Sequence, residues 1–151
     1  MSTDTSTDNP EKSRQGYIAA QLSDEAKRLG RRGWVIGAFF DRDDPNYCTD
    51  LEVKFGQYRA GENPKHPAKI SQTTEWTMIL AGAVRAWVDG DQVTLHAGDY
   101  ILIRPGIPNN TLVEVLEDVT VLTVKAPSDP SAKTILAGTA HPVHDDGGEG
   151  L

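Results

Sequence analysis

The chain has a single cysteine, Cys48, among its 151 residues, and it has no long apolar run. One cysteine cannot form a disulfide within the chain, and sparse cysteine is typical of reducing compartments. No apolar stretch approaches the roughly 20 residues that cross a bilayer as a helix. The first 15 residues carry acids and lack the apolar core of a secretory signal. The composition therefore predicts a cytoplasmic protein without a membrane span.

An excess of positive charge is also missing. The sequence holds 22 acidic and 15 basic residues, which gives a formal charge of −7, and such a surface repels nucleic acid and anionic lipid on average. Lysine and arginine do gather around Gly30, as Lys27-Arg28 and Arg31-Arg32. Cations in the last turn of a helix complement its dipole, which accounts for this cluster without a ligand. We therefore expect neither nucleic acid nor a membrane as a partner.

Long helical patterns are scarce, and helical spacing is confined to residues 16–29. These residues predict one or two short helices that end at Gly30. Residues 1–15 are polar and predict a disordered arm, and residues 128–151 predict a flexible tail. Between these ends, residues 16–127 are long enough for one domain with a core of ordinary size.

Short alternating apolar segments fill that domain. Strands are expected at residues 34–40, 51–57, 75–80, 83–88, 92–95, 100–103, 111–115 and 119–125. Gly82 predicts a bend or bulge, and Asp89-Gly90 predicts a tight hairpin. In the segment 51–57, Leu51, Val53 and Phe55 alternate with polar residues or glycine, which predicts one apolar and one solvated face. The pattern is that of an all-β sandwich or barrel.

Two segments resemble the motifs of the cupin family. Residues 98–109 (GDYILIRPGIPN) resemble the second motif, in which Gly-Asp, a short strand and a Pro-x-Gly turn lead to a histidine; Asn109 stands at that position. Residues 75–82 (EWTMILAG) are similar to the end of the first motif, but residues 68–71 (AKIS) stand where two histidines are expected. The resemblance covers residues 34–127. It implies an all-β, cupin-type jelly-roll β-barrel with a short N-terminal helix, a fold that commonly pairs as dimers.

The resemblance also implies where a metal would bind, because a cupin barrel ordinarily holds one with three histidines and a glutamate. This chain offers Glu75 and Asn109 at those positions, and two ligands rarely hold a transition metal. His66 lies in a Pro-rich loop beside Lys65 and is expected to be exposed, since it would reach inward only if that loop folds over the barrel. The other histidines are expected at the surface or in the tail: His96, His141 and His144. We therefore predict no metal and no other cofactor.

In the family orientation Glu75 points into the barrel, where a carboxylate is costly unless it is paired or hydrogen-bonded. The resemblance and strand alternation place possible partners near one pocket. We predict Glu75 and Lys125 as catalytic residues. The predicted substrate-binding residues are Gln57, Arg59, Thr77 and Asn109. A buried ion pair that only fixes the pocket is the structural alternative, whereas burial and a neighbouring cation could instead tune Glu75 for acid–base work.

Three functions remain open at this point. The first is a metal-independent isomerase, epimerase, cyclase or lyase, because proton transfer by Glu75 and a lysine needs no metal. The second is a non-catalytic or regulatory protein in which the same residues orient a ligand. The third is a metal-dependent oxygenase that uses Glu75, His66 and a further ligand. Fold alone does not choose between them.

A homodimer is expected because residues 34–40 form a strand that is apolar on both faces. Trp76, Arg85 and Trp87 alternate away from the predicted pocket. We interpret these three residues as a packing or dimerisation face rather than as ligand-binding groups.

Overall fold

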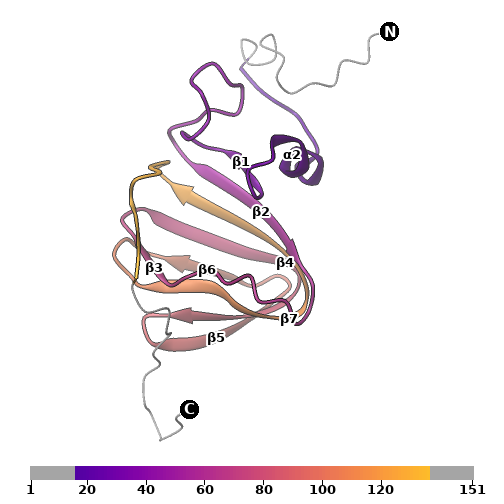
Figure 1. Cartoon of the computed structure of the whole chain (residues 1–151), viewed down its shortest axis with the longest axis vertical. Coiled ribbons are helices and arrows are strands. Elements are labelled where there is room, and N and C mark those ends of the chain that lie inside the picture. Colours follow the sequence, from indigo (N-terminus) through magenta and orange to yellow (C-terminus); the bar gives the residue numbers. More distant parts are fainter. Residues whose placement is uncertain (1–15, 137–151) are drawn as a thin grey trace, which may run out of the picture.

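The computed structural model describes residues 16–136 of the chain (Figure 1). The elements are α2 (Leu22–Leu29), β1 (Trp34–Ile36), β2 (Glu52–Tyr58), β3 (Lys69–Ser71), β4 (Thr74–Val88), β5 (Asp91–His96), β6 (Tyr100–Ile103), β7 (Asn109–Ala126) and β8 (Lys133–Ile135). The predicted arm 1–15 lies outside the described residues, as do His141 and His144. Within the described range, no helix has the length and apolar character of a membrane span.

Two long strands, β4 and β7, form the frame of the sheet. They pair in antiparallel fashion from Thr74 opposite Ala126 to Val88 opposite Asn109. β2 pairs with the second half of β7, and β5 and β6 pair with the two halves of β4. The strands curl around a common interior, as Figure 1 shows. The predicted all-β, jelly-roll architecture is confirmed.

The curl depends on irregular pairing near Gly82. The register of β4 against β7 shifts between Ile79 and Ala81 and again between Ala81 and Ala83. Gly82 has a φ of +83°, and a Cβ there would lie 2.0 Å from the carbonyl oxygen of Asp118. The predicted bend is therefore a bulge within one continuous strand, rather than a break between two strands.

The apolar core occupies one half of the interior. Its buried members come from β4, β5 and β7, and they are Ile79, Val84, Ala86, Leu95, Leu112, Val115, Val119 and Val121. Fully burying such a side chain contributes about 1.5–3 kcal/mol. The other half of the interior carries polar residues, and it holds the candidate site.

The N-terminal elements are shorter than the sequence predicts. The helix α2 begins only after Gln21, whose side chain accepts a hydrogen bond from the Asp24 N–H at 2.7 Å, and it ends at Gly30 as expected. β1 ends at Ile36 rather than at residue 40. Beyond it the chain turns, and the Phe39 ring packs against Trp34 with centroids 5.5 Å apart. The apolar residues after Ile36 therefore fold onto each other, which removes the two-sided strand on which the dimer was predicted.

The first part of the predicted tail packs on the domain. Ser128 is buried; its hydroxyl accepts from the Ala38 N–H at 2.8 Å and donates to Glu52 Oε2 at 3.1 Å. β8 then pairs with β3. Residues 128–136 thus differ from the expected flexible segment, because a hydroxyl and a short strand tie them to the sheet. The rest of the predicted tail lies outside the described residues.

Candidate functional site

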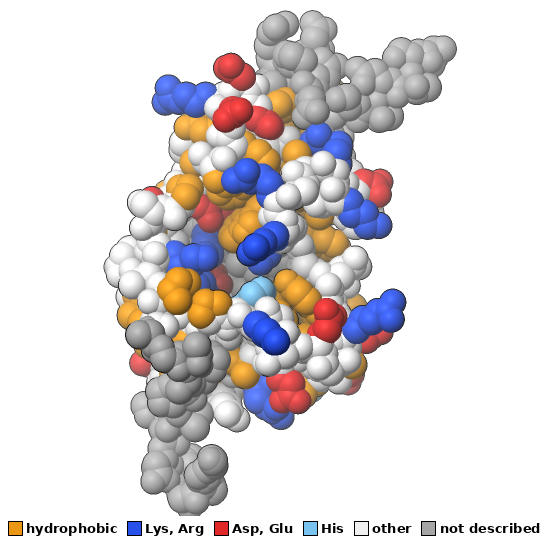
Figure 2. Space-filling model, in the orientation of Figure 1, with side chains coloured by type: hydrophobic (Ala, Val, Ile, Leu, Met, Phe, Trp, Pro, Cys, Tyr) orange, Lys and Arg blue, Asp and Glu red, His pale blue; other side chains and the backbone are white. Residues whose placement is uncertain are grey.

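A pocket of about 790 Å³ is formed by the inward faces of β2, β4 and β7. Residues of α2 and the segment 32–34 line one side, and residues 64–67 with β3 and β8 line another. Figure 2 shows a hollow in this face of the molecule with lysine and arginine side chains around it. The pocket is therefore assembled from segments that are far apart in the sequence.

Strand register places the polar residues of the pocket on one inward face. Glu75 on β4 pairs with Lys125 on β7, which in turn pairs with Glu52 on β2. Two residues along, Thr123 pairs with Lys54. Directly paired residues of antiparallel strands share a face. The face of β2 that was predicted to be solvated is therefore turned inward, where Lys54 lines the pocket and Glu52 is buried.

The charges that line the pocket are unbalanced. Its cations are Lys27, Arg32, Lys54, Lys65, Lys69, Lys125 and Lys133, whereas Glu75 is the one carboxylate among the described residues that line it. The whole chain is acidic, with a formal charge of −7. Positive charge is thus concentrated at this concave surface in an otherwise acidic protein.

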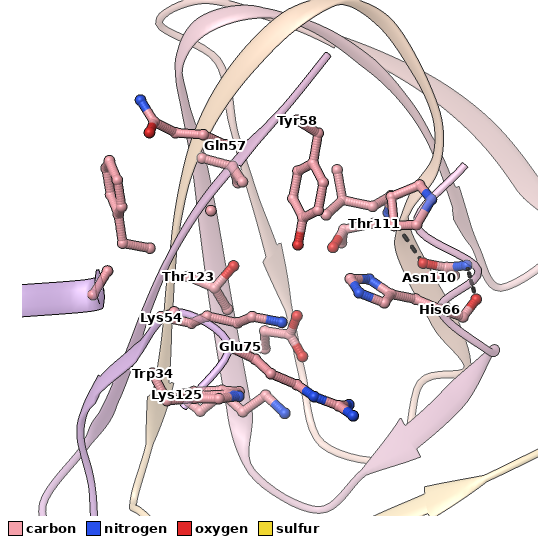
Figure 3. A pocket seen from close by; sticks show the side chains of 18 of the residues that line it. Trp34, Lys54, Gln57, Tyr58, His66, Glu75, Asn110, Thr111, Thr123 and Lys125 are labelled. Carbon is pink, nitrogen blue, oxygen red and sulfur yellow. Dashed lines mark hydrogen bonds between the residues drawn. The ribbon is translucent and has the colours of Figure 1, made fainter. Parts of the chain in front are cut away.

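Glu75 lies at the base of this cationic pocket. The residue is 3% exposed, and its Oε1 atom lies 3.1 Å from Lys69 Nζ. The contact is an ion pair, but Oε1 accepts no well-aligned hydrogen bond within residues 16–136. In Figure 3 the carboxylate points toward the middle of the pocket, near Lys54. Glu75 is therefore held by charge and still has acceptor capacity for a ligand.

Lys54 and Lys125 share an aromatic neighbour. Their Nζ atoms lie 5.6 Å and 5.5 Å from the centre of the Trp34 ring, within the range of cation–π contacts. Burial, followed by the repulsion of nearby cations, lowers the pKa of Lys54 below the usual 10.5. Burial also lowers the pKa of Lys125, against the opposing effect of Glu75. These ammonium groups repel one another, and an anion bound among them would relieve that repulsion.

His66 enters the pocket, contrary to the prediction of an exposed loop residue. The loop folds over the barrel because Asn110 Nδ2 donates to the His66 carbonyl oxygen at 2.7 Å. The imidazole lies edge-on to the Tyr58 ring with centroids 6.2 Å apart, and both rings point into the pocket in Figure 3. Burial, and then the surrounding lysines led by Lys54 and Lys69, lowers the pKa of His66 to about 4. The imidazole is therefore neutral at physiological pH.

The low pKa of His66 has a consequence for stability. As the pH falls below 6.5, the unfolded chain takes up a proton at His66, whereas the folded chain does so only near pH 4. We therefore expect the free energy of unfolding to decrease across this window, and the decrease to be smaller in His66→Gln. Urea denaturation of both proteins at pH 7 and pH 5 measures the difference. If an NMR titration gave the His66 imidazole a pKa near 6.5, the lowered pKa would be contradicted.

The predicted site residues are only partly brought together. Glu75 and Lys125 line the pocket, as predicted. Gln57 lies at the rim of the pocket, and its side chain points away from Glu75 and Lys125 in Figure 3. Arg59 is exposed and does not line the pocket. Its backbone N–H bonds to the side chain of Glu62 in the turn after β2.

Two further predicted residues lie just behind the pocket wall. Thr77 is 1% exposed, and its hydroxyl lies 3.1 Å from that of Thr123, which does line the pocket. Asn109 is also 1% exposed, and its Oδ1 accepts from Lys69 Nζ at 2.8 Å. Both residues therefore position pocket groups and offer no surface of their own to a ligand.

Sequence reasoning missed most of the cations. Lys54 was placed on a solvated face, because alternation does not distinguish bulk water from a polar pocket. Lys27 and Arg32 were explained by the helix dipole, yet both reach the pocket. Lys69 carried a usable signal, since it is a cation within the segment where two metal-binding histidines were expected.

The residues present do not fit a cupin metal site. Within residues 16–136, no group of three or more His, Cys, Asp or Glu side chains is placed to hold a metal ion. His66 and Glu75 are the pocket's available donors of these types, and Glu75 already pairs with Lys69. A cation next to a metal ligand opposes metal binding by charge repulsion. We therefore derive no chemical step through a metal.

Comparison with known proteins agrees with this architecture. Residues 56–125 match the family described as the cupin domain. No curated protein matches the sequence. An uncharacterised conserved protein with a double-stranded β-helix domain from Klebsiella pneumoniae has a similar solved structure, with a TM-score of 0.59 at 12% identity. That match covers 81% of this chain and 99% of the other.

Two further solved structures are similar. DMSP lyase DddQ from Ruegeria pomeroyi has a TM-score of 0.53 at 17% identity, over 81% of this chain and 61% of that one. The protein BH2720 from Bacillus halodurans has a TM-score of 0.52 at 16% identity, over 78% and 86% of the two chains. At these identities the likeness concerns the fold alone. The sequence match over residues 56–125 and the curled β-sheet together show a cupin-type fold.

Proposed function

We propose that this protein binds an anionic small molecule in its barrel and acts on it without a metal. The observation that carries the proposal is the charge of the pocket, which is lined by seven lysine or arginine residues and by Glu75. Charge-assisted hydrogen bonds from lysine to carboxylate or phosphate oxygens are among the stronger contacts available to a ligand. The ligand class is therefore a small molecule with two or more anionic oxygens.

A proton transfer by Glu75 is the reaction that the pocket supports best. The carboxylate would take a proton from the ligand carbon next to a carbonyl or carboxylate group, and the bonding electrons would move onto oxygen. Lys125 and the other ammonium groups would stabilise the charge that develops on that oxygen. This scheme matches an isomerase, epimerase, cyclase or lyase.

A non-catalytic binding role is the second candidate, and the ion pair between Glu75 and Lys69 favours it. A carboxylate held 3.1 Å from an ammonium forms an ion pair, which suits an anchor for a ligand hydroxyl. In this case the same cations bind the ligand and no proton moves. The effect of removing the Glu75 charge separates the two roles.

Calorimetric titration tests the proposed ligand class. We expect succinate and inorganic phosphate to bind, each more weakly as the salt concentration rises, and the neutral diamide of succinate not to bind. Lys125→Met should weaken succinate binding by about tenfold or more, because it removes a charged donor. Arg42→Met deletes one cation from an exposed loop outside the pocket and should leave the affinity unchanged. Equal binding of succinate and its diamide would overturn the proposal.

We also propose that the protein is a homodimer, through the outward face of β4 and β6. Trp76 lies 6.2 Å from Tyr100 between ring centres on this face. Tyr100, Leu102 and Leu80 are 62%, 43% and 46% exposed, which is unusual for neighbouring large apolar residues. Trp87 is buried, and Arg85 pairs with Glu114 of the same chain. Trp87 and Arg85 are therefore not part of the proposed dimer face.

Sedimentation equilibrium tests the assembly. Wild type should sediment at about twice the 16.4 kDa of one chain. Tyr100→Asp should shift the protein toward the monomer, whereas Tyr17→Asp alters a tyrosine that is equally exposed, at 61%, away from this face. A wild-type monomer at tens of micromolar would refute the dimer. The predicted cytoplasmic location stays a prediction.

A further inference from the structure

Lys69 lies between two residues that correspond to metal-ligand positions of the cupin motifs. Its Nζ is 3.1 Å from Glu75 Oε1 and 2.8 Å from Asn109 Oδ1. Glu75 occupies the glutamate position of the first motif, and Asn109 occupies the histidine position of the second. Lys69 itself comes from the segment where the two missing histidines were expected. An ammonium group therefore lies where these two motif positions converge.

The surroundings hold this ammonium in a fixed position. Asn109 donates its Nδ2 hydrogen to the Ile107 carbonyl oxygen at 2.9 Å, which turns its Oδ1 toward Lys69. The backbone of β3 pairs with β7 at Asn109, so the two residues start from neighbouring strands. The Lys69 side chain is only 15% exposed, yet it lines the pocket. Both the direction and the position of the ammonium are thus set by the fold.

The chemistry of lysine leaves one direction for a ligand. An ammonium group has three N–H donors and no acceptor. Asn109 takes one donor, and the carboxylate of Glu75 faces a second. The third can reach an oxygen in the pocket. Because neighbouring cations surround the site, an anionic oxygen is the group that this donor would bind most strongly.

We propose that the Lys69 ammonium is the resident cation of this pocket: it takes the place between Glu75 and Asn109 that a metal ion would take, and it binds one anionic oxygen of the ligand. The inference rests on the proposed anion-binding function and adds to it the residue that replaces the metal. It also explains why Asn109 suits the histidine position, since an amide oxygen accepts a hydrogen bond from an ammonium.

The test must separate ligand binding from folding. Removing Lys69 alone would leave the Glu75 carboxylate buried without its partner, and a loss of folding would then be mistaken for a loss of binding. The comparison is therefore made in the Glu75→Gln background, where Lys69→Met leaves no buried carboxylate without its partner. The variants are Glu75→Gln, the double variant Lys69→Met/Glu75→Gln and the control Arg42→Met/Glu75→Gln. Each is titrated calorimetrically with succinate and with inorganic phosphate, which distinguishes carboxylate from phosphate ligands.

We expect Glu75→Gln to bind at least one probe as tightly as wild type or more tightly, because it removes a negative charge from the pocket. The Lys69→Met/Glu75→Gln protein should bind that probe about 10- to 100-fold more weakly, the loss expected for one charge-assisted hydrogen bond. The control should bind like Glu75→Gln.

Purified wild type should contain no stoichiometric Fe, Mn, Ni or Zn by elemental analysis, and it should not bind Ni²⁺ stoichiometrically when titrated.

Three outcomes overturn the inference. Equal affinities of Glu75→Gln and Lys69→Met/Glu75→Gln would show that Lys69 is structural only, and they would leave the proposed function standing. About one transition metal ion per wild-type chain would show that the metal position is not taken by the lysine. Failure of wild type and Glu75→Gln to bind either probe would overturn the proposed function together with this inference.

Discussion

Glu75→Gln should lower turnover of the anionic substrate by about 100-fold or more, while the affinity for that substrate is unchanged or higher. The substitution keeps the size of the side chain and deletes the charge that accepts a proton, and general base catalysis usually contributes at least this factor. The affinity should not fall, because Glu75 is the carboxylate among the cations that line the pocket. For a substrate with an acidic carbon, the assay follows deuterium uptake from D₂O by NMR.

The matched control is Glu117→Gln, which makes the same change on an exposed residue of β7 outside the pocket. It should leave both turnover and affinity as in wild type. A fall in the affinity of Glu75→Gln without loss of turnover would identify Glu75 as an anchor and not a base. Unaltered turnover and affinity would mean that the chemistry lies elsewhere, and the assignment of the pocket would have to be abandoned.

Gly82→Ala should destabilise the fold by about 2–4 kcal/mol. Gly82 has a φ of +83°, which strains any residue with a side chain, and the new Cβ would lie 2.0 Å from the backbone oxygen of Asp118. No side-chain rotation relieves such a contact, so the strands β4 and β7 must move apart where the sheet bends. The measurement is the free energy of unfolding of wild type and Gly82→Ala from guanidinium chloride denaturation. The two proteins should have the same m-value, so that the difference reports stability alone.

Gly61→Ala separates the two causes of this loss. Gly61 has nearly the same φ, +82°, but a Cβ there would meet no atom within 4 Å. This variant should therefore show only the cost of the left-handed conformation, about 1–2 kcal/mol. If Gly61→Ala and Gly82→Ala lose equal stability, then close packing against Asp118 does not contribute, and the structural account of the bulge is wrong.

Most strands could be predicted from the sequence because their signals are local, whereas the choice of a jelly-roll barrel rested on the two motifs. Alternation located most strands, Asp89-Gly90 marked a turn in which both residues have positive φ, and Gly82 marked the bulge. One exception is the segment after Ile36, where apolar residues alternate as in a strand but pack on one another as an aromatic cluster. Short-range pattern does not show that a chain turns back on itself, because that depends on which tertiary contacts form.

The site could be predicted less well because it depends on which polar face is turned inward. Glu75 and Lys125 were found through the motif and the last strand. Lys54 was assigned to solvent, since a polar face toward a pocket has the same alternation as one toward water. His66 was assigned to the exposed loop surface, but a hydrogen bond from Asn110 to its backbone carbonyl oxygen holds that loop against the barrel. Contacts between residues more than 40 positions apart decided both cases.

A crystal structure of the protein with succinate or phosphate bound tests the central claim most directly, provided that diffraction data are also collected at transition-metal absorption edges. We predict an anion in the barrel with oxygens within hydrogen-bond distance of Lys69 and Lys125, the Lys69 ammonium between Glu75 and Asn109, and no anomalous peak there. An anomalous peak beside Glu75 would contradict the account. So would an anion that binds only at places where it does not contact Lys69 or Lys125.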